Sequence, residues 1–351
     1  MRLVQFGHLT QRRLANFRTN KRAFWSLRIF IVLLVLSLFA ELIANDKPLL
    51  LGFDGNLYVP ALVTYPETTF GGELFSETDY HEREVQALIA AKAGWIIWPP
   101  IPFAYNTVDW EIGEPVPSPP SARHWLGTDD VARDVAARII YGFRLSVLFG
   151  LALTLLSSVV GISVGAVQGF FGGWVDLIGQ RLVEIWAGMP MLFLLIILAS
   201  LVQPSAVTLL GLLLLFSWMA LVAVVRAEFL RTRNFDYVRA SRALGVSNFD
   251  IMRLDVLPNA MVAALTFLPF ILTGSITTLT SLDFLGFGLP AGSPSLGELL
   301  AQGKANLNAP WLGLSGFFAL VVMLTLLIFI GEGVRDAFDS RRSVTSVDAK
   351  V

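Results

Sequence analysis

Six long apolar runs most strongly restrict what this chain can fold into. They cover residues 24–44, 146–170, 185–202, 207–225, 260–282 and 312–331. A helix needs about 20 residues to cross the hydrocarbon core of a bilayer, and each run is close to that length. The last five runs contain no Asp, Glu, Lys, Arg or His, and a charge at the bilayer centre costs roughly 2.5 to 3.5 kcal/mol on insertion scales. The sequence therefore predicts an all-α polytopic membrane protein with six transmembrane helices.

Basic residues give the direction of these helices. The first 28 residues contain seven Lys or Arg and no acidic residue, which by the positive-inside rule places the N-terminus in the cytoplasm. Six crossings return the C-terminus to the same side, where 18 of the 26 basic residues then lie. This start also resembles a signal peptide, but no small-x-small cleavage site follows it. We expect an uncleaved first helix, a cytoplasmic N-terminus at 1–23 and a cytoplasmic tail at 340–351.

The segment 45–145, between the first two helices, is predicted to lie outside the membrane. Its residues 45–137 hold 14 acidic and 5 basic side chains, and 10 of the 17 prolines. The acidic surplus fits a surface that attracts cations, and it fits an ordinary solvated external surface equally well.

The same segment is long enough for a small mixed insertion. Its runs at 49–62 and 94–103 are typical of short strands interrupted by turns. The run 82–93 is typical of a helix, which we expect to end at Gly94.

The composition removes several classes of site. The chain has no cysteine, which excludes disulfides, thiolate nucleophiles and cysteine-based metal sites. Its histidines, His8, His81 and His124, lie far apart in the sequence, so the spacing of a paired-histidine metal site is absent. The net charge of -1 provides no basic field for nucleic acid. We expect neither a metalloenzyme nor a nucleic-acid-binding protein.

Two short motifs look catalytic but have simpler interpretations. Gly161-x-Ser163-x-Gly165 matches the nucleophile elbow of hydrolases, which needs a turn between a strand and a helix, whereas this motif lies inside an apolar run. Gly161, Gly165 and Gly169 instead form a stripe along which a second helix can approach closely. Residues 297–304 resemble a phosphate-binding loop, but the glycine spacing and the missing Ser or Thr break the motif. We expect helix packing at the glycine stripe and no nucleotide site.

The polar segment 226–259 between the fourth and fifth apolar runs is the most informative one. Asn234 or Asp236 is suited to cap a helix that runs to Leu244. Gly245 then supplies a left-handed stop.

A second short helix is predicted directly after this glycine. Ser247 and Asp250 form a capping box for it, and Pro258 marks the place near which it should end. The product is a helix, a glycine and a helix on the cytoplasmic side. The apolar residues of this hairpin are Tyr237, Leu244, Val246, Phe249 and Met252. They need a surface to pack against, which is the membrane, the protein's own helix bundle or a partner protein.

Three stretches give this chain a specific family resemblance. Residues 236–247, DYVRASRALGVS, with Leu257-Pro258-Asn259, resemble the EAA loop of permease subunits in binding-protein-dependent ABC importers. Residues 124–134 and 283–290, with Pro310-Trp311, resemble the dipeptide and oligopeptide branch of that family. The match extends from about residue 20 to 339 and is closest to the Yej-type permeases. Arg239 and Ser241 stand where the EAA signature has Glu and Ala.

The resemblance implies a fold and a function. It implies a type I ABC importer permease with a core at 146–339, a cytoplasmic coupling loop at 226–259 and a periplasmic loop at 283–311. In that family the coupling helices dock on the ATPase subunit, so ATP hydrolysis drives alternating access. The residues that the resemblance assigns to ATPase coupling are Asp236, Arg239, Ala240, Ser241, Gly245 and Pro258.

The family also implies partners and substrates. The partners are a second permease subunit in a heterodimer, a cytoplasmic ATP-binding subunit that holds ATP and Mg²⁺, and a periplasmic peptide-binding protein. The substrates are oligopeptides and peptide-like antibiotics such as microcin C. This chain would then be a multi-pass subunit of the bacterial inner membrane, with no cofactor and no catalytic site of its own.

The residues themselves support an external energy source. A secondary transporter usually places an Asp, Glu or His near the middle of the membrane for its coupling ion, and the last five apolar runs have none. The alternative function is a membrane-anchored protein whose external segment binds or hydrolyses a ligand. It would require a catalytic constellation in 45–137, where His81, His124 and scattered carboxylates show no recognisable spacing. The sequence names no substrate-contacting residue.

Overall fold

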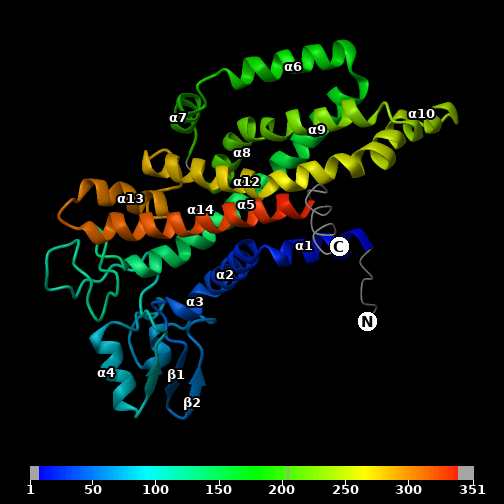
Figure 1. The fold of residues 1–351 in the computed structure, drawn as a ribbon. Coiled ribbons are helices and arrows are strands. Elements are labelled where there is room, and N and C mark those ends of the chain that lie inside the picture. The colour runs from blue at the N-terminus through cyan, green and yellow to red at the C-terminus, as the bar shows by residue number, and fades with distance from the viewer. Residues whose placement is uncertain (1–7, 204, 339–351) are drawn as a thin grey trace. The chain divides into compact units, whose positions relative to one another are not determined.

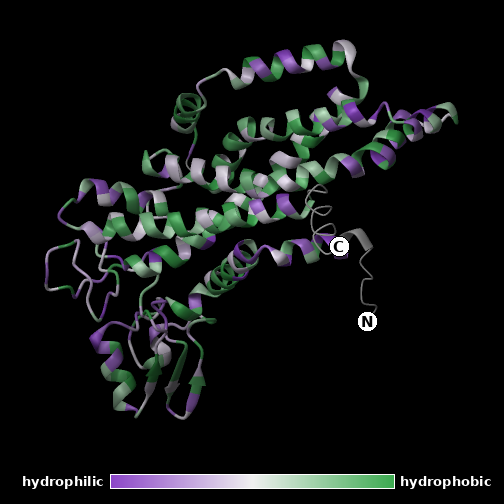
Figure 2. Cartoon of the chain, viewed as in Figure 1, coloured by the Kyte–Doolittle hydropathy of each residue, from purple (hydrophilic) through white to green (hydrophobic). Residues whose placement is uncertain are grey.

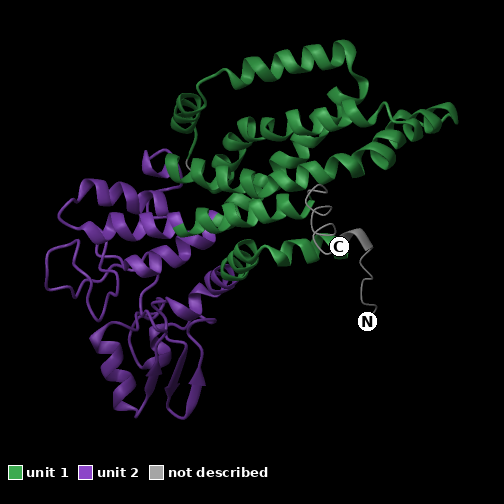
Figure 3. Cartoon of the chain, viewed as in Figure 1, with its two compact units in different colours: residues 1–31, 147–282, 322–351 green, residues 32–146, 283–321 purple. Residues whose placement is uncertain are grey.

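The computed structural model describes residues 8–203 and 205–338, which divide into two compact units (Figures 1 and 3). Unit 1 takes its described residues from 1–31, 147–282 and 322–351, and unit 2 comprises 32–146 and 283–321. Each unit thus combines segments that are distant in the sequence. The predicted tail 340–351 and the first seven residues of the predicted N-terminal segment lie outside the described residues.

Helices make up most of the described chain. They are α1 His8–Thr19, α2 Lys21–Leu38, α3 Ala40–Ile43, α4 Arg83–Ala91, α5 Val135–Phe171, α6 Gly173–Ala187, α7 Met191–Leu201, α8 Ala206–Ser217, α9 Met219–Thr232, α10 Asp236–Ala243, α11 Asn248–Asp250, α12 Leu257–Phe284, α13 Leu296–Ala305 and α14 Pro310–Phe338. A 3-10 turn, η1, covers Glu67–Phe70, and a wide π-helical turn, η2, covers Ile251–Val256. The strands are β1 Leu50–Phe53, β2 Asn56–Tyr58 and β3 Trp95–Ile97.

Several helices are long and apolar enough to cross a membrane. Three are continuous: α5, α14 and the helical stretch Asn248–Phe284 that joins α11, η2 and α12. Two bent pairs, α6 with α7 and α8 with α9, pass the same test together, so the described residues contain between three and five candidate spans. Figure 2 shows hydrophobic residues along most of α5, α12 and α14. The helical, polytopic character agrees with the sequence, while the count of six is not reached here.

The first apolar run, 24–44, explains this difference. Its helix is interrupted at Phe39, between α2 and α3. The 18 residues of α2 include three basic ones, which keep α2 outside the set of sufficiently apolar helices. One of them, Arg28, lies over the ring of Phe24, 4.2 Å from its centroid, as a long basic side chain does when its apolar stem stays at an apolar surface.

The apolar runs 185–202 and 207–225 each belong to a bent pair of helices. The run 185–202 begins in the last turn of α6 and continues in α7, with an angle of 74° between the two helices. Pro190 lies in this break as the N-cap of α7, and the residue before a proline is disfavoured in the helical region. Pro269, by contrast, lies inside α12, which continues through it.

Unit 2 contains a small antiparallel sheet in the order β2-β1-β3. Leu51 of β1 faces Tyr58 of β2 on one side and Ile96 of β3 on the other. Residues from the sheet, η1 and α4 form one buried cluster: Leu51, Phe53, Phe70, Tyr80, Val85 and Ile89. The runs predicted to be strands therefore contain all three strands, and the helical run contains α4.

The end of α4 differs from the prediction. The helix stops at Ala91, and Ala93, not Gly94, has the left-handed backbone, with φ at 53°. Gly94 is needed for space instead. A Cβ at this position would lie 2.6 Å from Cγ2 of Ile89 and 2.7 Å from the carbonyl oxygen of Gly52, so α4 and β1 approach closely only past a glycine.

Candidate functional site

The 226–259 loop of unit 1 folds into a sharply turned helical hairpin. Helix α10 ends in a Schellman motif: the N–H of Gly245 donates to Arg242 O at 3.1 Å, and the N–H of Val246 donates to Ser241 O at 3.1 Å. Gly245 has φ at 79°, the left-handed backbone that glycine adopts without strain. The glycine thus reverses the chain between α10 and α11.

The caps of the two helices differ in kind. Ser247 is the N-cap of α11, and its hydroxyl accepts from the N–H of Asp250 and bonds the Asp250 carboxylate at 2.6 Å. The N-cap of α10 is Phe235, with no side-chain cap. The prediction that Asn234 or Asp236 caps this helix is therefore wrong. Asn234 donates its side-chain amide backwards to Leu230 O at 3.1 Å, in competition with capping.

The second helix does not end near Pro258 as expected. α11 continues through η2 into α12, so the helical stretch Asn248–Phe284 has no break at the proline. In a regular α-helix the ring of Pro258 would clash with the carbonyl of the residue four positions before it. The wide π-helical turn at Ile251–Val256 lies just there and provides the extra space.

A few apolar side chains anchor the loop. Val238, Ile251 and Val256 are fully buried and belong to a core cluster that also contains residues of α5, α9 and α12. Tyr237 adds a polar tie, since its hydroxyl accepts from the side-chain amide of Asn259 at 2.8 Å. α10 is thereby fastened to the start of α12.

The tip of the loop is exposed and apolar. Every residue from 242 to 250 is exposed. Leu244, at the end of α10, is 84% exposed and Phe249, in α11, is 69% exposed, which are high values for large apolar side chains. Figure 2 shows hydrophilic and hydrophobic residues side by side in this loop. The base of the loop is thus fixed while its apolar tip has no cover within the described chain.

The residues assigned to coupling are spread along the loop, from its base at Asp236 and Pro258 to the turn at Gly245. Asp236, Arg239, Ala240 and Ser241 are on α10, Gly245 is in the turn and Pro258 is in the first turn of α12. Ser241 is half-buried and the other five are exposed. The guanidinium of Arg242 lies over the Phe170 ring at 5.7 Å, so this arginine is directed towards α5.

The glycine stripe on α5 faces α9. A Cβ at Gly165 would lie 2.8 Å from the carbonyl oxygen of Val222, and one at Gly169 would lie 2.6 Å from that of Arg226. A Cβ at Gly161 would be 3.1 Å from the Cβ of Leu221. The stripe therefore lies against backbone, where a larger side chain has no room.

Two arginines of this region have partners that the sequence reasoning did not find. Arg233 donates from Nη1 to the carbonyl oxygens of Gly169 and Phe170 at 3.3 and 3.2 Å, which places a cation at the C-terminus of α5. Arg226 forms an ion pair with Asp176, with Nη2 2.6 Å from Oδ2. The sequence indicated these two contacts only weakly, since a basic residue near the end of a membrane helix is common in any membrane protein.

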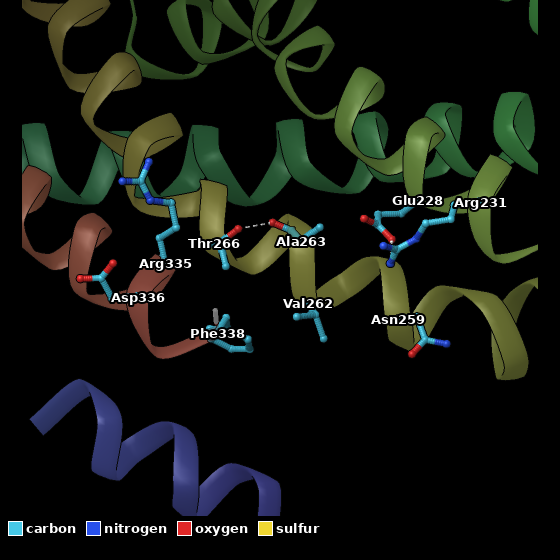
Figure 4. A pocket seen from close by; sticks show the side chains of 9 residues that line it. All are labelled: Glu228, Arg231, Asn259, Val262, Ala263, Thr266, Arg335, Asp336 and Phe338. Atoms are coloured by element: carbon cyan, nitrogen blue, oxygen red, sulfur yellow. Dashed lines mark hydrogen bonds and ion pairs between the residues drawn. The ribbon is translucent and has the colours of Figure 1, made fainter. Parts of the chain in front are cut away.

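A cavity of about 470 Å³ lies beside the loop, between α9, α12 and α14 (Figure 4). Asn259, which ties α12 to α10, is part of its wall. Its charged side chains are Glu228, Arg231, Arg335 and Asp336. Glu228 accepts from Arg231 at 2.6 Å, and the two acids balance the two bases. Because the charges of the wall cancel, the cleft is polar but selects neither a cationic nor an anionic ligand.

The other two family-like stretches converge within unit 2. Arg133 and Arg138 each bond Glu298 of α13, at 3.1 and 3.0 Å, and Arg133 also bonds Asp129 at 2.7 Å. Trp311 donates its indole N–H to Thr128 O at 3.4 Å. Arg138 and Asp129 are fully buried, whereas the Glu298 side chain is 27% exposed, so this ion network joins the start of α5 to α13 at a largely buried site.

His124 connects two further carboxylates in unit 2. Its Nδ1 lies 2.8 Å from Asp134 Oδ2, and its Nε2 lies 3.1 Å from Asp109 Oδ2. Burial lowers the pKa of His124, but the hydrogen bonds to Asp134 and Asp109 outweigh it and raise the pKa above its usual value. Both ring nitrogens are engaged by buried carboxylates, so this imidazole has no free nitrogen with which to act as a general base on a substrate. The hydrolase alternative loses its strongest residue.

The motifs that resemble catalytic ones are helical. Ser163 donates to Val159 O at 2.7 Å inside α5, so no strand-to-helix elbow exists there. Residues 297–304 lie within α13, whose N-cap is Ser295. Across residues 8–203 and 205–338, no group of three His, Asp or Glu side chains is placed to hold a metal ion.

Comparisons with known proteins give relatives over nearly the whole chain. Residues 135–344 match a family described as "Binding-protein-dependent transport system inner membrane component". The chain is 56% identical to the peptidoglycan transport system permease protein YejE of Agrobacterium fabrum, over 96% of this chain and 94% of that protein. It is 60% identical to the inner membrane ABC transporter permease protein YejE of Escherichia coli, over 97% and 100%. It is 35% identical to the dipeptide transport system permease protein DppC of Bacillus subtilis, over 64% and 70%.

Proposed function

Since this chain belongs to the family of binding-protein-dependent transport system inner membrane components, we propose that it is the membrane-spanning permease subunit of an ATP-driven peptide importer. The family prediction made from the sequence is confirmed. The chain is a transporter subunit and not itself an enzyme. The observation that carries the proposal is the 226–259 loop, with an apolar tip that is exposed and a base that is buried.

The proposed topology has six spans with both termini in the cytoplasm. α2 together with α3 would form the first span, and the bent pairs α6–α7 and α8–α9 would form the third and fourth. The 226–259 loop then lies in the cytoplasm and the 45–145 segment in the periplasm of the inner membrane. The support is the excess of basic residues on the side of the loop.

We propose that the tip of the loop docks on a separate cytoplasmic ATPase subunit. Leu244 and Phe249 would fill an apolar groove of that subunit, and Arg239 would meet acidic groups at its rim. Asp236, Ala240, Ser241, Gly245 and Pro258 would shape the contact surface. ATP and Mg²⁺ would be held by the ATPase, with no cofactor in this chain.

The loop is built to transmit a displacement. Helical structure is continuous from Asn248 to Phe284, and the bond between Asn259 and Tyr237 joins α10 to this stretch. A force applied at the tip would therefore reach α12 without passing through a flexible joint. This is how ATP-driven motion of the ATPase would alternate the access of the transport path.

The remaining proposals concern partners and substrate. A second permease subunit would complete the path as a heterodimer, and a periplasmic binding protein would deliver the substrate. The relatives are named as peptidoglycan and dipeptide transport permeases, which supports oligopeptides and peptide-like compounds, with microcin C as one example.

The docking proposal is tested at the tip of the loop. A tagged chain is purified in mild detergent from its native membrane, and the co-purifying ATPase subunit is quantified. Because each tenfold in affinity corresponds to about 1.4 kcal/mol, and a buried charge in an apolar groove costs more than this, we expect Leu244→Asp and Phe249→Asp to reduce recovered ATPase at least tenfold. Leu307→Asp is the matched control, since Leu307 is 81% exposed outside the loop. Equal ATPase recovery from all variants would contradict the proposal.

A further inference from the structure

A second cavity, of about 730 Å³, lies within the 45–145 segment of unit 2. Its wall comes from residues 46–47, from the stretch 77–84 that leads into α4, and from residues between 103 and 123. Seven carboxylates, three basic side chains and four rings line it. The volume is that of a site for a small ligand.

Ion pairs inside the protein neutralise only part of this acidic wall. Lys47 pairs with Glu77, Arg83 with Glu111 and Arg123 with Asp109. These pairs occupy every basic residue of the wall. Four lining carboxylates have no ion pair among the described residues, namely Asp46, Asp79, Glu82 and Glu84. The cavity therefore has a net negative wall that no cation of the described chain compensates.

The rings of the wall are not equally available. Phe103 is 2% exposed and is stacked between His81 and His124, at centroid distances of 5.5 and 4.5 Å. Trp110 is 89% exposed and has no ring partner within the described chain. An open indole face beside carboxylates is the arrangement that binds an organic cation through a cation–π contact.

Two buried polar atoms of the lining residues lack a partner. They are the hydroxyl of Tyr80 and Nε2 of His81. The Tyr80 side chain is 2% exposed, so water reaches it poorly, and an unsatisfied buried polar group costs roughly 1 to 3 kcal/mol. Because these atoms are themselves buried, contacts with a ligand are left to the carboxylates and the indole at the cavity surface.

The same wall argues against a metal ion. Within the described residues, no three carboxylate or imidazole groups are grouped closely enough to hold one, and Ca²⁺ requires six to eight oxygen ligands around one point. The negative charge is distributed over the wall, which suits an extended cation better than a point charge.

We propose that this cavity binds an organic cation with a primary amine or guanidinium group. The carboxylates of Asp79 and Glu82 would pair with the charged group, and Trp110 would cover it. The site goes beyond the proposed function, because binding here needs neither the ATPase nor the second permease. If the ATPase docking experiment at the 226–259 loop failed, the proposal of a cation site in this cavity would still stand.

The first test is direct binding to the full-length chain in detergent micelles. The probe is the dipeptide lysyl-lysine, measured by titration calorimetry at low salt. We expect saturable binding that weakens as salt is added, and at least tenfold weaker binding of the dipeptide acetylated on all its amines. Cadaverine and agmatine, which carry the amine and the guanidinium without a peptide bond, distinguish recognition of the cationic group from recognition of a peptide. Either form of recognition fits the site, whereas equal binding of the acetylated dipeptide overturns it.

Variants then locate the site. The double change Asp79→Asn with Glu82→Gln should weaken binding about tenfold, which corresponds to about 1.4 kcal/mol. Trp110→Leu should weaken it about threefold, as expected for a cation–π contact at an exposed ring. Glu114→Gln is the control, because Glu114 is an exposed acid of the same segment outside the cavity wall. Thermal unfolding verifies that each variant folds. An equal loss in the control, or no loss in the cavity variants, assigns the binding to general surface charge and rejects the site.

Discussion

The 226–259 loop and the 45–145 segment are held in place by different forces. The loop is anchored by buried apolar side chains such as Val238 and Ile251, and its tip is exposed and apolar. The segment has its own apolar cluster around the sheet and α4, and in addition a set of buried charges, with His124 between two carboxylates and the fully buried Arg138 bonded to Glu298. Apolar burial is non-directional, whereas a buried ion pair is favourable only in a good geometry. The difference suits a loop that moves with a partner and an outer region that keeps its shape.

The largest effect is expected where a buried charge loses its partner. The double change Arg133→Met with Arg138→Met leaves Asp129 and Glu298 without either of their cations, and leaving a buried charge unpaired in this way costs about 3 to 5 kcal/mol. We expect a strong loss of thermal stability in detergent and faster proteolysis in unit 2. Arg83→Met is the control, because its pair with Glu111 is solvent-exposed and exposed pairs contribute little. Similar stabilities of the two variants would show that the buried ion pairs do not hold unit 2 in place.

The next effect concerns the packing beneath the loop. Gly165→Leu introduces a side chain whose Cβ alone would lie 2.8 Å from Val222 O, and overpacking of a tight contact costs about 1 to 3 kcal/mol. We expect reduced yield of folded protein and a lower unfolding temperature. Gly274→Leu is the control, since nothing lies within 4 Å of a Cβ there. If both variants were equally stable, α5 and α9 would not depend on the stripe.

A smaller effect should follow the charge of His124. Its folded-state pKa is raised, so its contribution to stability is complete below the unfolded pKa of about 6.5 and is lost as pH rises through the folded value. We expect wild-type unit 2 to lose stability towards alkaline pH. His124→Gln should cost about 1 to 2 kcal/mol at neutral pH, because it leaves buried carboxylates short of a partner, and should flatten this pH profile. An unchanged profile would show that His124 is not the titrating group.

The smallest effect is expected at the turn of the loop. Gly245→Ala places a Cβ at φ 79°, which costs about 1 to 2 kcal/mol locally, although no neighbour lies within 4 Å. We expect a normal unfolding temperature for the chain as a whole and a modest loss of ATPase recovery. Gly211→Ala, at a helical position with open space, should change neither quantity. A full loss of ATPase with Gly245→Ala would show that the turn itself is in the contact.

Much of unit 1 was predictable because its signals are local. Apolar runs of a fixed length, glycines spaced by four and a glycine between two short polar helices all depend on residues close in the sequence. The breaks within α6–α7 and α8–α9 were not predictable to the same degree. Pro190 marks the first break, but Pro269 shows that a proline in an apolar run does not by itself end a helix.

Unit 2 was predictable in its strands and in α4, and much less in its contacts. The pair of Arg138 with Glu298 and the bond of Trp311 to Thr128 join residues more than 150 positions apart. No periodicity encodes such a pair. The sequence showed His124 as an isolated histidine, and only the fold places Asp109 and Asp134 on either side of it.

The sequence by itself thus determined that the chain is a polytopic membrane protein, where its apolar helices lie and which loop would turn at Gly245, since hydrophobicity and backbone preference act over a few residues. Only the tertiary structure decided which charges are buried together, which helices bend, and that the apolar tip of the loop and the acidic cavity stay open. The physical reason is that burial and ion pairing depend on distances between residues far apart in the chain, and those distances exist only once the helices have packed.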